Sequence, residues 1–293
     1  MFNHTATRPG APPTLLWLIA ATCALGGVMG CVVSDDDERP SNLPIGAWTL
    51  TWEETFDGAA GEAPDPARWT YDIGTGVDGW GNNQLEYNTD RPENVALDGQ
   101  GNLVITARRE DFQGSEYTSA RMLTRDLFTQ AYGRFEARIK LPVGRGIWPA
   151  FWMLGDDIDE VSWPRCGEID IMEYRGQEPW AVTGSLHGPG YSGGSPITSR
   201  FTMEDRGSFA DDFHVFAVEW HPSRIAWLVD GEVYHVATPA QAPSGQWVFD
   251  HPFFLLLNVA VGGNYVGSPD DTTPFPQQML VDYVRVYTYE LLE

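Results

Sequence analysis

Three carboxylates lie close together in one short segment of the chain. Gly167-Glu168-Ile169-Asp170-Ile171-Met172-Glu173-Tyr174 carries Glu168, Asp170 and Glu173 within a stretch typical of a strand. In a regular strand Glu168 and Asp170 share a face, whereas Glu173 points the other way, into a core where an unpaired charge is costly. A β-bulge near Ile171-Met172 adds one residue and returns Glu173 to the face of the other two acids. We therefore expect three acids on one open face.

Such a cluster can perform acid–base and nucleophilic chemistry on a sugar. Neighbouring like charges raise the pKa of one carboxyl, which makes a proton donor available near neutral pH. Two carboxyls about 5 Å apart form the catalytic pair of a retaining glycosidase, in which one attacks the anomeric carbon and the other exchanges a proton. Four regular strand steps separate Cα atoms by about 13 Å, so the side chains must lean together across a concave sheet. A solvated acidic edge or a Ca²⁺ site are the alternatives, although interleaved Ile169, Ile171 and Met172 argue against a flat polar loop.

The segments around this cluster also have strand periodicity. Apolar residues occupy every second position in 134–141 and in 102–107, which indicates strands with one buried face. Residues 252–261 are apolar almost throughout, as expected of a strand buried on both faces. No capped amphipathic run of helical length is found, and the composition does not change after residue 45. One antiparallel β-sandwich of about 245 residues is the simplest interpretation.

One hairpin is predicted near the C-terminal third of the chain. Ile225, Trp227 and Val229 alternate up to Asp230-Gly231, and Val233 resumes the pattern beyond it. Asp-Gly between two alternating runs favours a tight β-turn.

The acidic cluster and three further segments of the chain resemble the motifs of a known family. Glu168-x-Asp170-x-x-Glu173 is similar to the signature of glycoside hydrolase family 16 in its bulged version, and specifically to its bacterial laminarinases, which are endo-β-1,3-glucanases. Trp80–Tyr87 resembles the substrate-cleft loop of that family, Gly146–Leu154 the strand leading toward the catalytic one, and Asp282–Tyr287 the closing strand. The resemblance implies a β-jelly-roll sandwich of two antiparallel sheets with a concave glycan-binding cleft.

The resemblance also implies a role for each acid. Glu168 corresponds to the nucleophile and Glu173 to the general acid/base. Asp170, between them, would hydrogen-bond the nucleophile and tune its charge.

Five further residues are candidates for substrate binding. Trp148, Trp152 and Trp163 would stack on pyranose rings, with core packing as the alternative. Asn83 would hydrogen-bond sugar hydroxyls or simply serve the turn chemistry of its Gly/Asn loop. His187 would approach the acid/base or be a satisfied strand histidine.

The family resemblance further implies a structural Ca²⁺ on the convex side, and no cofactor for catalysis. Its oxygen ligands would come from Glu54, the Gly101 carbonyl and Asp282, a donor set that suits Ca²⁺. Thr55 stands where family members often carry a second acid, which leaves this ligand set open.

The N-terminus predicts export and lipid attachment. Residues 1–30 contain an apolar run that is short for a membrane span, and Val28-Met29-Gly30-Cys31 resembles a bacterial lipobox, with Cys31 as the lipidated first mature residue. The alternatives are an ordinary secretory signal and an uncleaved anchor. Residues 31–44 read as an acidic tether, which leaves 45–293 as the catalytic domain. After processing, Cys166 would be the only thiol, a buried filler, so no internal disulfide is expected.

Composition limits the partners. A net charge of −23 excludes nucleic acid, and it leaves a lipid anchor as the only membrane contact. With 42% hydrophobic residues and 12 Trp, 11 Tyr and 14 Phe, disorder is excluded. We expect a monomer that takes a neutral β-glucan as substrate.

Four other functions stay open. Hydrolases of agar, carrageenan or porphyran share the signature but usually need basic cleft residues, and this chain has one Lys. A mixed-linkage β-1,3-1,4-glucanase and a transglycosylase are further enzyme alternatives. A non-catalytic β-glucan-binding protein would tolerate loss of the acids, all of which are present here.

Overall fold

The structure, a computed structural model, describes residues 46–291 of the chain. These residues belong to one of the two units into which the chain divides, Pro44–Glu293. The proposed signal peptide, Cys31 and the tether lie outside the described residues and stay predictions. Within the described part, no helix is long and apolar enough to cross a membrane.

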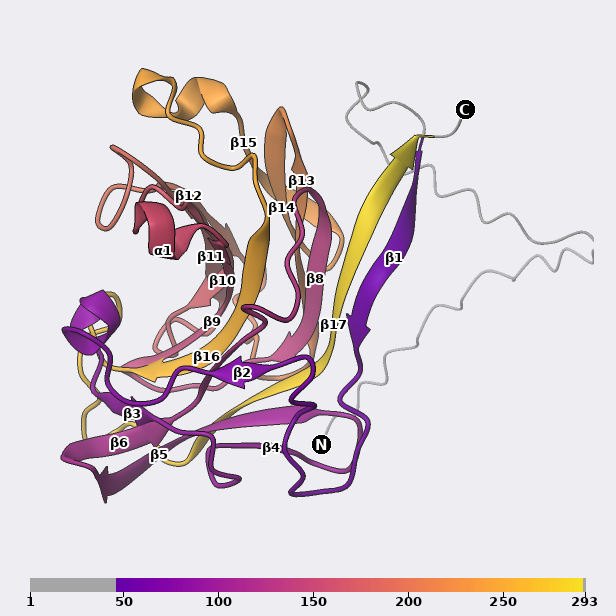
Figure 1. The fold of residues 1–293 in the computed structure, drawn as a ribbon. Coiled ribbons are helices and arrows are strands. Elements are labelled where there is room, and N and C mark those ends of the chain that lie inside the picture. The colour runs from indigo at the N-terminus through magenta and orange to yellow at the C-terminus, as the bar shows by residue number, and fades with distance from the viewer. Residues whose placement is uncertain (1–45, 292–293) are drawn as a thin grey trace, which may run out of the picture. The chain divides into compact units, whose positions relative to one another are not determined.

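Two β-sheets form this unit (Figure 1). We call the ten-stranded sheet the outer sheet and the seven-stranded sheet the inner sheet. The outer sheet contains β1 (Gly46–Glu54), β3 (Glu86–Asn88), β4 (Val95–Leu97), β5 (Leu103–Phe112), β6 (Ser115–Ser119), β8 (Gly133–Lys140), β13 (His214–His221), β14 (Arg224–Val229), β15 (Glu232–Ala237) and β17 (Gln277–Leu291). The inner sheet contains β2 (Thr70–Tyr71), β7 (Arg121–Leu123), β9 (Ile147–Gly155), β10 (Glu168–Tyr174), β11 (Ala181–His187), β12 (Ile197–Thr202) and β16 (Phe253–Val261).

The sheet order confirms the predicted jelly-roll sandwich. The inner sheet runs β12-β11-β10-β9-β16-β7-β2, and the outer sheet runs β15-β14-β13-β8-β17-β5-β6-β3, with β1 beside β17 and β4 beside β5. Among the described strand pairs, only β3 with β6 is parallel. Figure 1 shows β9 to β12 and β16 as a curved layer whose concave side faces away from β8, β13 and β14.

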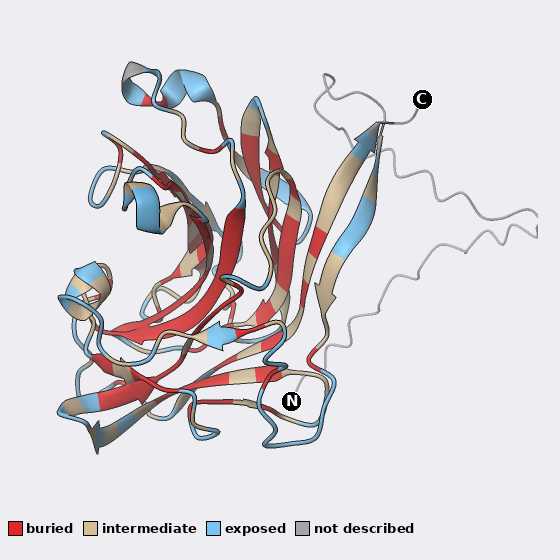
Figure 2. Cartoon of the chain, viewed as in Figure 1, coloured by how far each residue is buried: buried red, intermediate tan, exposed pale blue. Residues whose placement is uncertain are grey.

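The core lies between the two sheets, as the sequence periodicity predicts. Phe135, Ala137 and Ile139 of β8 are fully buried, as are Leu103 and Ile105 of β5. All of β16 is buried, which confirms the expected strand with two covered faces (Figure 2). Helices are short: α1 (Ile158–Val161), η1 (Gly79–Asn83), η2 (Pro239–Gln241) and η3 (Pro243–Gly245).

The predicted hairpin forms, but its alternation does not continue as expected. β14 and β15 flank Asp230-Gly231, and Trp227 is fully buried. Val233, however, is 42% exposed. Trp227 pairs with His235 and Leu228 with Val233, so β15 carries one extra residue, Tyr234. Val233 itself pairs with Leu228 across the two-residue turn, so it lies on the face opposite to Trp227 and Val229 and points away from the core.

Cys166 is the buried filler that the sequence predicts. It is fully buried in a small cluster with Leu154 and Phe254. Burial raises the pKa of its thiol to about 12, so the thiolate that a nucleophile needs is not available at neutral pH.

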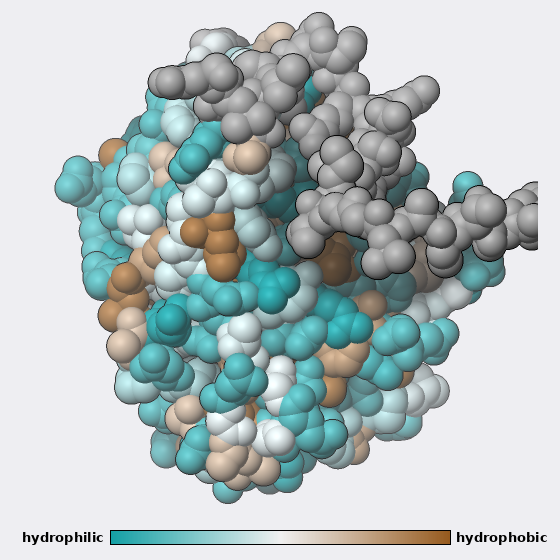
Figure 3. Space-filling view, turned by 90° about the vertical axis from the view of Figure 1, so that its right-hand side faces the viewer, coloured by the Kyte–Doolittle hydropathy of each residue, from teal (hydrophilic) through white to brown (hydrophobic). Residues whose placement is uncertain are grey.

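Polar side chains dominate the face that carries β1 and β17, where apolar residues are scattered singly (Figure 3). Such scattered residues are normal for a soluble surface.

Candidate active site

The central feature of the site is the bulge in β10. Against β9, Asp170 pairs with Trp152 and Met172 with Phe151, so β10 has one more residue than its neighbour. Against β11, Asp170 pairs with Ser185 and Glu173 with Thr183, which again leaves one extra residue in β10. The predicted bulge at Ile171-Met172 is therefore confirmed, and it returns Glu173 to the face of Glu168 and Asp170.

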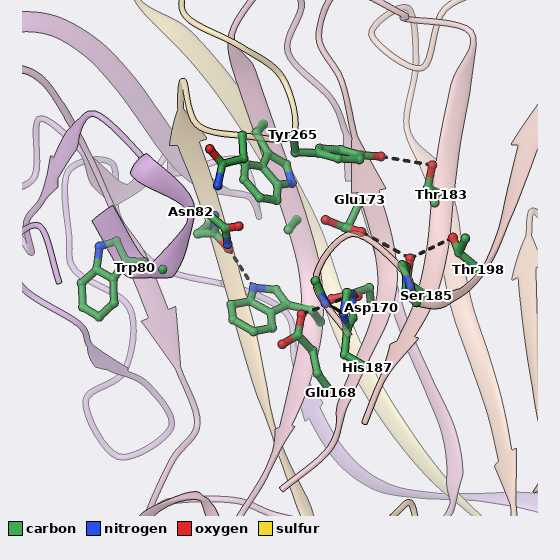
Figure 4. Close-up of a pocket in the computed structure, with 18 of the residues that line it drawn as sticks. Trp80, Asn82, Glu168, Asp170, Glu173, Thr183, Ser185, His187, Thr198 and Tyr265 are labelled. Carbon is green, nitrogen blue, oxygen red and sulfur yellow. Dashed lines mark hydrogen bonds and ion pairs between the residues drawn. The ribbon is translucent and has the colours of Figure 1, made fainter. Parts of the chain in front are cut away.

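All three acids open into one cleft on the inner sheet (Figure 4). The cleft has a volume of about 880 Å³. The other residues that line it are Trp80, Gly81, Asn82, Gln84, Arg121, Trp148, Ala150, Trp152, Leu154, Ile158, Trp163, Arg175, Glu178, Ala181, Thr183, Ser185, His187, Gly193, Gly194, Pro196, Thr198, Arg200, Asn258, Asn264 and Tyr265. This volume falls in the range of clefts that bind small molecules or a few sugar residues.

Two ring N–H groups approach Glu168. The indole Nε1 of Trp163 donates a hydrogen bond to Oε2 of Glu168 at 2.7 Å. Nε2 of His187 lies 3.9 Å from Oε1. Trp163 therefore supplies a hydrogen bond to one oxygen of Glu168, while the His187 ring lies near the other.

Asp170 is the most deeply buried of the three acids, at 2% exposed. Burial, with the neighbouring charge of Glu168 and a hydrogen bond to it, holds the pKa of Asp170 well above its usual range. A protonated Asp170 can donate its proton in a hydrogen bond to Glu168. This is the contact to the nucleophile that the family resemblance implies for Asp170.

The orientation of His187 is set by a backbone group. The Gly193 N–H donates to Nδ1 of His187 at 3.1 Å, so in the neutral ring the proton is on Nε2. That nitrogen lies 3.1 Å from Oδ2 of Asp170. His187 thus lies closest to Asp170 and Glu168, and its charge also acts on the acid/base Glu173.

Glu173 has the environment of a proton donor. Burial, and then the charge of Asp170, hold the pKa of its carboxyl well above the usual range, while His187 and the Trp148 indole oppose the rise. The Ser185 hydroxyl lies 3.4 Å from Oε2 of Glu173 and 3.0 Å from the Thr198 hydroxyl. A carboxyl whose pKa is raised keeps its proton to higher pH, which suits it to general acid catalysis.

One set of side chains has the composition of a metal site. Glu168, Asp170 and His187 each offer one ligand atom, and these atoms lie within 4.8 Å of one another. A metal at Nε2 would move the ring proton to Nδ1, where the Gly193 N–H already donates. The arrangement therefore suits a proton-linked trio better than a metal ion.

The three tryptophans predicted to bind sugar all line the cleft, with different exposure. Trp163 is 43% exposed and lies beside the His187 ring, whereas Trp148 is 8% exposed and packs at a tilt against Tyr265 with ring centroids 5.0 Å apart. Trp152 is partly buried and donates its Nε1 to Asn258 at 2.8 Å.

Asn83, another predicted sugar ligand, does not line the cleft. Its amide donates to Asn264 at 3.0 Å, and its φ of 56° is the left-handed conformation common for Asn in turns. The turn alternative is therefore the better description of Asn83. The neighbouring Asn82 and the partner Asn264 are the amides that line the cleft.

Sequence reasoning missed several cleft residues. Arg121 lies between the rings of Trp80 and Trp152, at 4.5 and 4.8 Å from their centroids, and pairs with Asp72 at 2.9 Å. Asn258 is buried within the apolar strand β16. A single amide in an apolar run is itself an indication of a function, because a buried polar group needs a partner.

The residues predicted to hold Ca²⁺ lie on β1, β17 and the turn before β5. Glu54 accepts a hydrogen bond from the Phe56 N–H at 3.0 Å, while its Oε2 is buried with no hydrogen-bond partner and lies 3.7 Å from Nε of Arg68. Asp282 pairs through Oδ2 with Arg138 at 2.7 Å. Oε2 of Glu54 accepts no hydrogen bond, although Arg68 lies close to it, and the second oxygen of Asp282 is not used by Arg138.

Comparison with known proteins agrees with this geometry. Residues 81–285 match the family model Glycosyl hydrolases family 16. A β-glucanase from Rhodothermus marinus is 42% identical over 283 residues, covering 90% of this chain and 93% of that protein. A glucan endo-1,3-beta-glucosidase from Cryptopygus antarcticus is 39% identical over 264 residues, covering 83% of this chain and 93% of that protein. The laminarinase catalytic domain from Thermotoga maritima superposes with a TM-score of 0.77 at 49% identity, covering 82% of this chain and 98% of that structure.

The raised pKa values have a consequence for stability. In the unfolded chain the carboxyls of Asp170 and Glu173 have ordinary pKa values, so the folded state binds more protons than the unfolded state. The contribution of these two groups to the free energy of unfolding is therefore fully present below about pH 4 and is lost as pH rises through their raised pKa values. Asp170→Asn removes one of these groups but keeps a donor toward Glu168. We expect its Tm to match wild type near pH 4 and to exceed it by at least about 2 °C near pH 8, measured by differential scanning fluorimetry.

Glu204→Gln is the matched control, since Glu204 is exposed and the substitution removes the same formal charge. An equal gain in Tm in both variants near pH 8 would mean that only net charge matters, and would contradict the burial argument.

Proposed function

The chain belongs to glycosyl hydrolase family 16, and we propose that it hydrolyses internal β-1,3-glucosidic bonds of laminarin-like β-glucans by a retaining double displacement. The observation that carries this function is the bulged strand β10, which directs Glu168, Asp170 and Glu173 into one cleft lined by indole rings and amides. Membership of the family and similarity to β-1,3-glucan hydrolases agree with it.

In the first step Glu168 attacks the anomeric carbon and forms a glycosyl ester. Glu173 donates its proton to the glycosidic oxygen as the bond to the departing sugar breaks. The raised pKa of Glu173 keeps that proton available. The step therefore consumes the proton of Glu173 and the charge of Glu168.

In the second step Glu173, now a carboxylate, takes a proton from water while the water oxygen attacks the anomeric carbon. The ester bond breaks, and Glu168 leaves with its negative charge restored. The Trp163 N–H and the proton of Asp170 stabilise that charge, so they assist the departure of Glu168. Two inversions at the same carbon give net retention.

The cleft is suited to an uncharged chain of sugars. Trp163 offers an exposed indole ring, and Asn82 and Asn264 offer amides. Its arginines are already engaged, since Glu178 lies 2.9 Å from Arg200 and 3.9 Å from Arg175. A neutral β-glucan therefore fits better than a sulfated galactan.

Three further properties complete the proposal. We propose that the protein acts as a monomer, that it is exported and held by a lipid on Cys31, and that Glu54, the Gly101 carbonyl and Asp282 bind a structural Ca²⁺. The buried Oε2 of Glu54, which accepts no hydrogen bond, supports the calcium site.

The two glutamates can be told apart by chemical rescue. Glu168→Ala and Glu173→Ala are both expected to lose laminarin hydrolysis, by a factor of about 10³ or more, while remaining folded. With an activated aryl glucoside and azide, Glu168→Ala should yield the α-glycosyl azide, because azide occupies the vacated nucleophile position. Glu173→Ala should yield the β-azide, because azide attacks the glycosyl enzyme from the opposite face. Product anomers are read by NMR, and the reverse pattern would exchange the proposed roles.

Linkage preference follows from a product profile. Purified protein is incubated with laminarin, curdlan, lichenan and agarose, and the products are separated by chromatography. We expect a ladder of oligosaccharides from laminarin and curdlan early in the reaction, as internal cleavage requires. Cleavage of agarose alone would overturn the proposed function, and equal rates on lichenan would extend it to mixed-linkage glucan.

The calcium proposal predicts a metal-dependent stability. After removal of divalent ions with EDTA, added Ca²⁺ should raise the Tm by several degrees, since a ligand that binds only the folded state stabilises it. Glu54→Gln should abolish most of that rise, whereas Glu204→Gln should not. A wild-type Tm that does not change when Ca²⁺ is added after EDTA treatment would refute the calcium site.

A further inference from the structure

A tryptophan of the outer sheet reaches across the core to the bulge of β10. Trp227, on β14, is fully buried and donates its indole Nε1 to the backbone carbonyl of Asp170 at 2.8 Å. Asp170 is the last residue before the register shift on both sides of β10. The hydrogen bond therefore holds the peptide group between Asp170 and Ile171, where the bulge begins.

A glycine on the neighbouring strand makes room for this contact. Because Asp170 pairs with Ser185 and Glu173 with Thr183, Gly184 is the single residue opposite the bulged pair of β10. A Cβ on Gly184 would lie 2.4 Å from Cδ1 of Trp227 and 2.5 Å from the Tyr234 hydroxyl. Any side chain there would displace the indole, so the bulge, the glycine and the tryptophan fit together as one unit.

The Trp227 ring also packs against a neighbouring side chain. His235, on β15, packs against Trp227 with ring centroids 4.8 Å apart. A buried indole held between His235 and the gap at Gly184 has little freedom to move, so its N–H acts as a fixed donor.

We propose that Trp227 is a positioning residue for catalysis, which fixes the spacing of Glu168, Asp170 and Glu173 by holding the Asp170 carbonyl at the start of the bulge. It touches neither substrate nor the reacting atoms. Without this donor the carbonyl is buried and unsatisfied, and β10 can relax toward a regular register in which Glu173 no longer shares the face of Glu168. The inference rests on the proposed glucanase function.

The test is Trp227→Phe, which removes the N–H and keeps most of the ring. Trp220→Phe is the matched control, because Trp220 on the adjacent strand β13 is equally buried and donates to the Phe249 carbonyl at 3.2 Å, outside the cleft. Both variants lose one buried hydrogen bond and should lose similar Tm. We expect kcat on laminarin to fall at least about ten-fold in Trp227→Phe and less than about two-fold in Trp220→Phe, with KM nearly unchanged in both.

A pH profile distinguishes positioning from general loosening of the fold. The charged or titratable groups that face Glu173 are Asp170 and Glu168 on β10, His187 on β11, Tyr234 on β15 and Tyr265 after β16. If the acids move apart in Trp227→Phe, the raising effect of Asp170 on Glu173 weakens, and the basic limb of kcat/KM should move to lower pH. Trp220→Phe should leave that limb in place.

Gly184→Ala gives an independent variant, since it keeps the indole N–H but pushes the ring away from the carbonyl. Active sites are counted by the burst from an activated 2-fluoro glucoside, so that kcat refers to folded enzyme only. The same loss of kcat is expected, and this variant decides alone if Trp227→Phe does not fold. Wild-type kcat and pH profile in the folded variants, or losses no larger than in Trp220→Phe, would overturn the inference. A wild-type enzyme that cuts none of the glucans would instead overturn the proposed function.

Discussion

The inner sheet depends on a single irregularity in its hydrogen-bond ladder, the extra residue that β10 carries between Asp170 and Glu173. A regular strand must alternate its faces, so without this residue Glu173 would point into the core. The cost of the irregularity is a local loss of ladder pairing. The structure offsets it with the Trp227 donor from the opposite sheet and with the space left at Gly184.

The acids in the cleft are kept in an environment that is unfavourable for their charges. Burial raises the pKa of both Asp170 and Glu173, and a short chain of contacts from Gly193 through His187 directs a proton toward Asp170. On its exposed side, Glu168 accepts a hydrogen bond from the indole N–H of Trp163. Different surroundings thus separate the proton donor from the charged nucleophile on one strand.

Sequence reasoning reached the fold and the catalytic strand because both follow local rules. Alternation in β8 and β5 identifies the core face, and the spacing of Glu168, Asp170 and Glu173 requires the bulge that the structure contains. It could not find Arg121 or Asn264, whose positions in the cleft depend on how distant strands and loops meet. For Asn83 the local loop pattern was compatible with two roles, and only the bond to Asn264 separates them. Val233 points away from the core because the two-residue turn pairs it with Leu228, a register that the alternation within each run does not specify.

The bulge, Gly184 and Trp227 lie on three different strands from two sheets. They depend on one another, because Trp227 donates to the carbonyl at the bulge and its ring needs the space left by Gly184. We therefore expect the three features to be inherited together. Replacing the glycine without shrinking the indole, or losing the indole without straightening β10, passes through an intermediate with a disturbed active site. We expect descendants of this chain to vary widely on the solvent face of the outer sheet, while these positions change together or remain as they are.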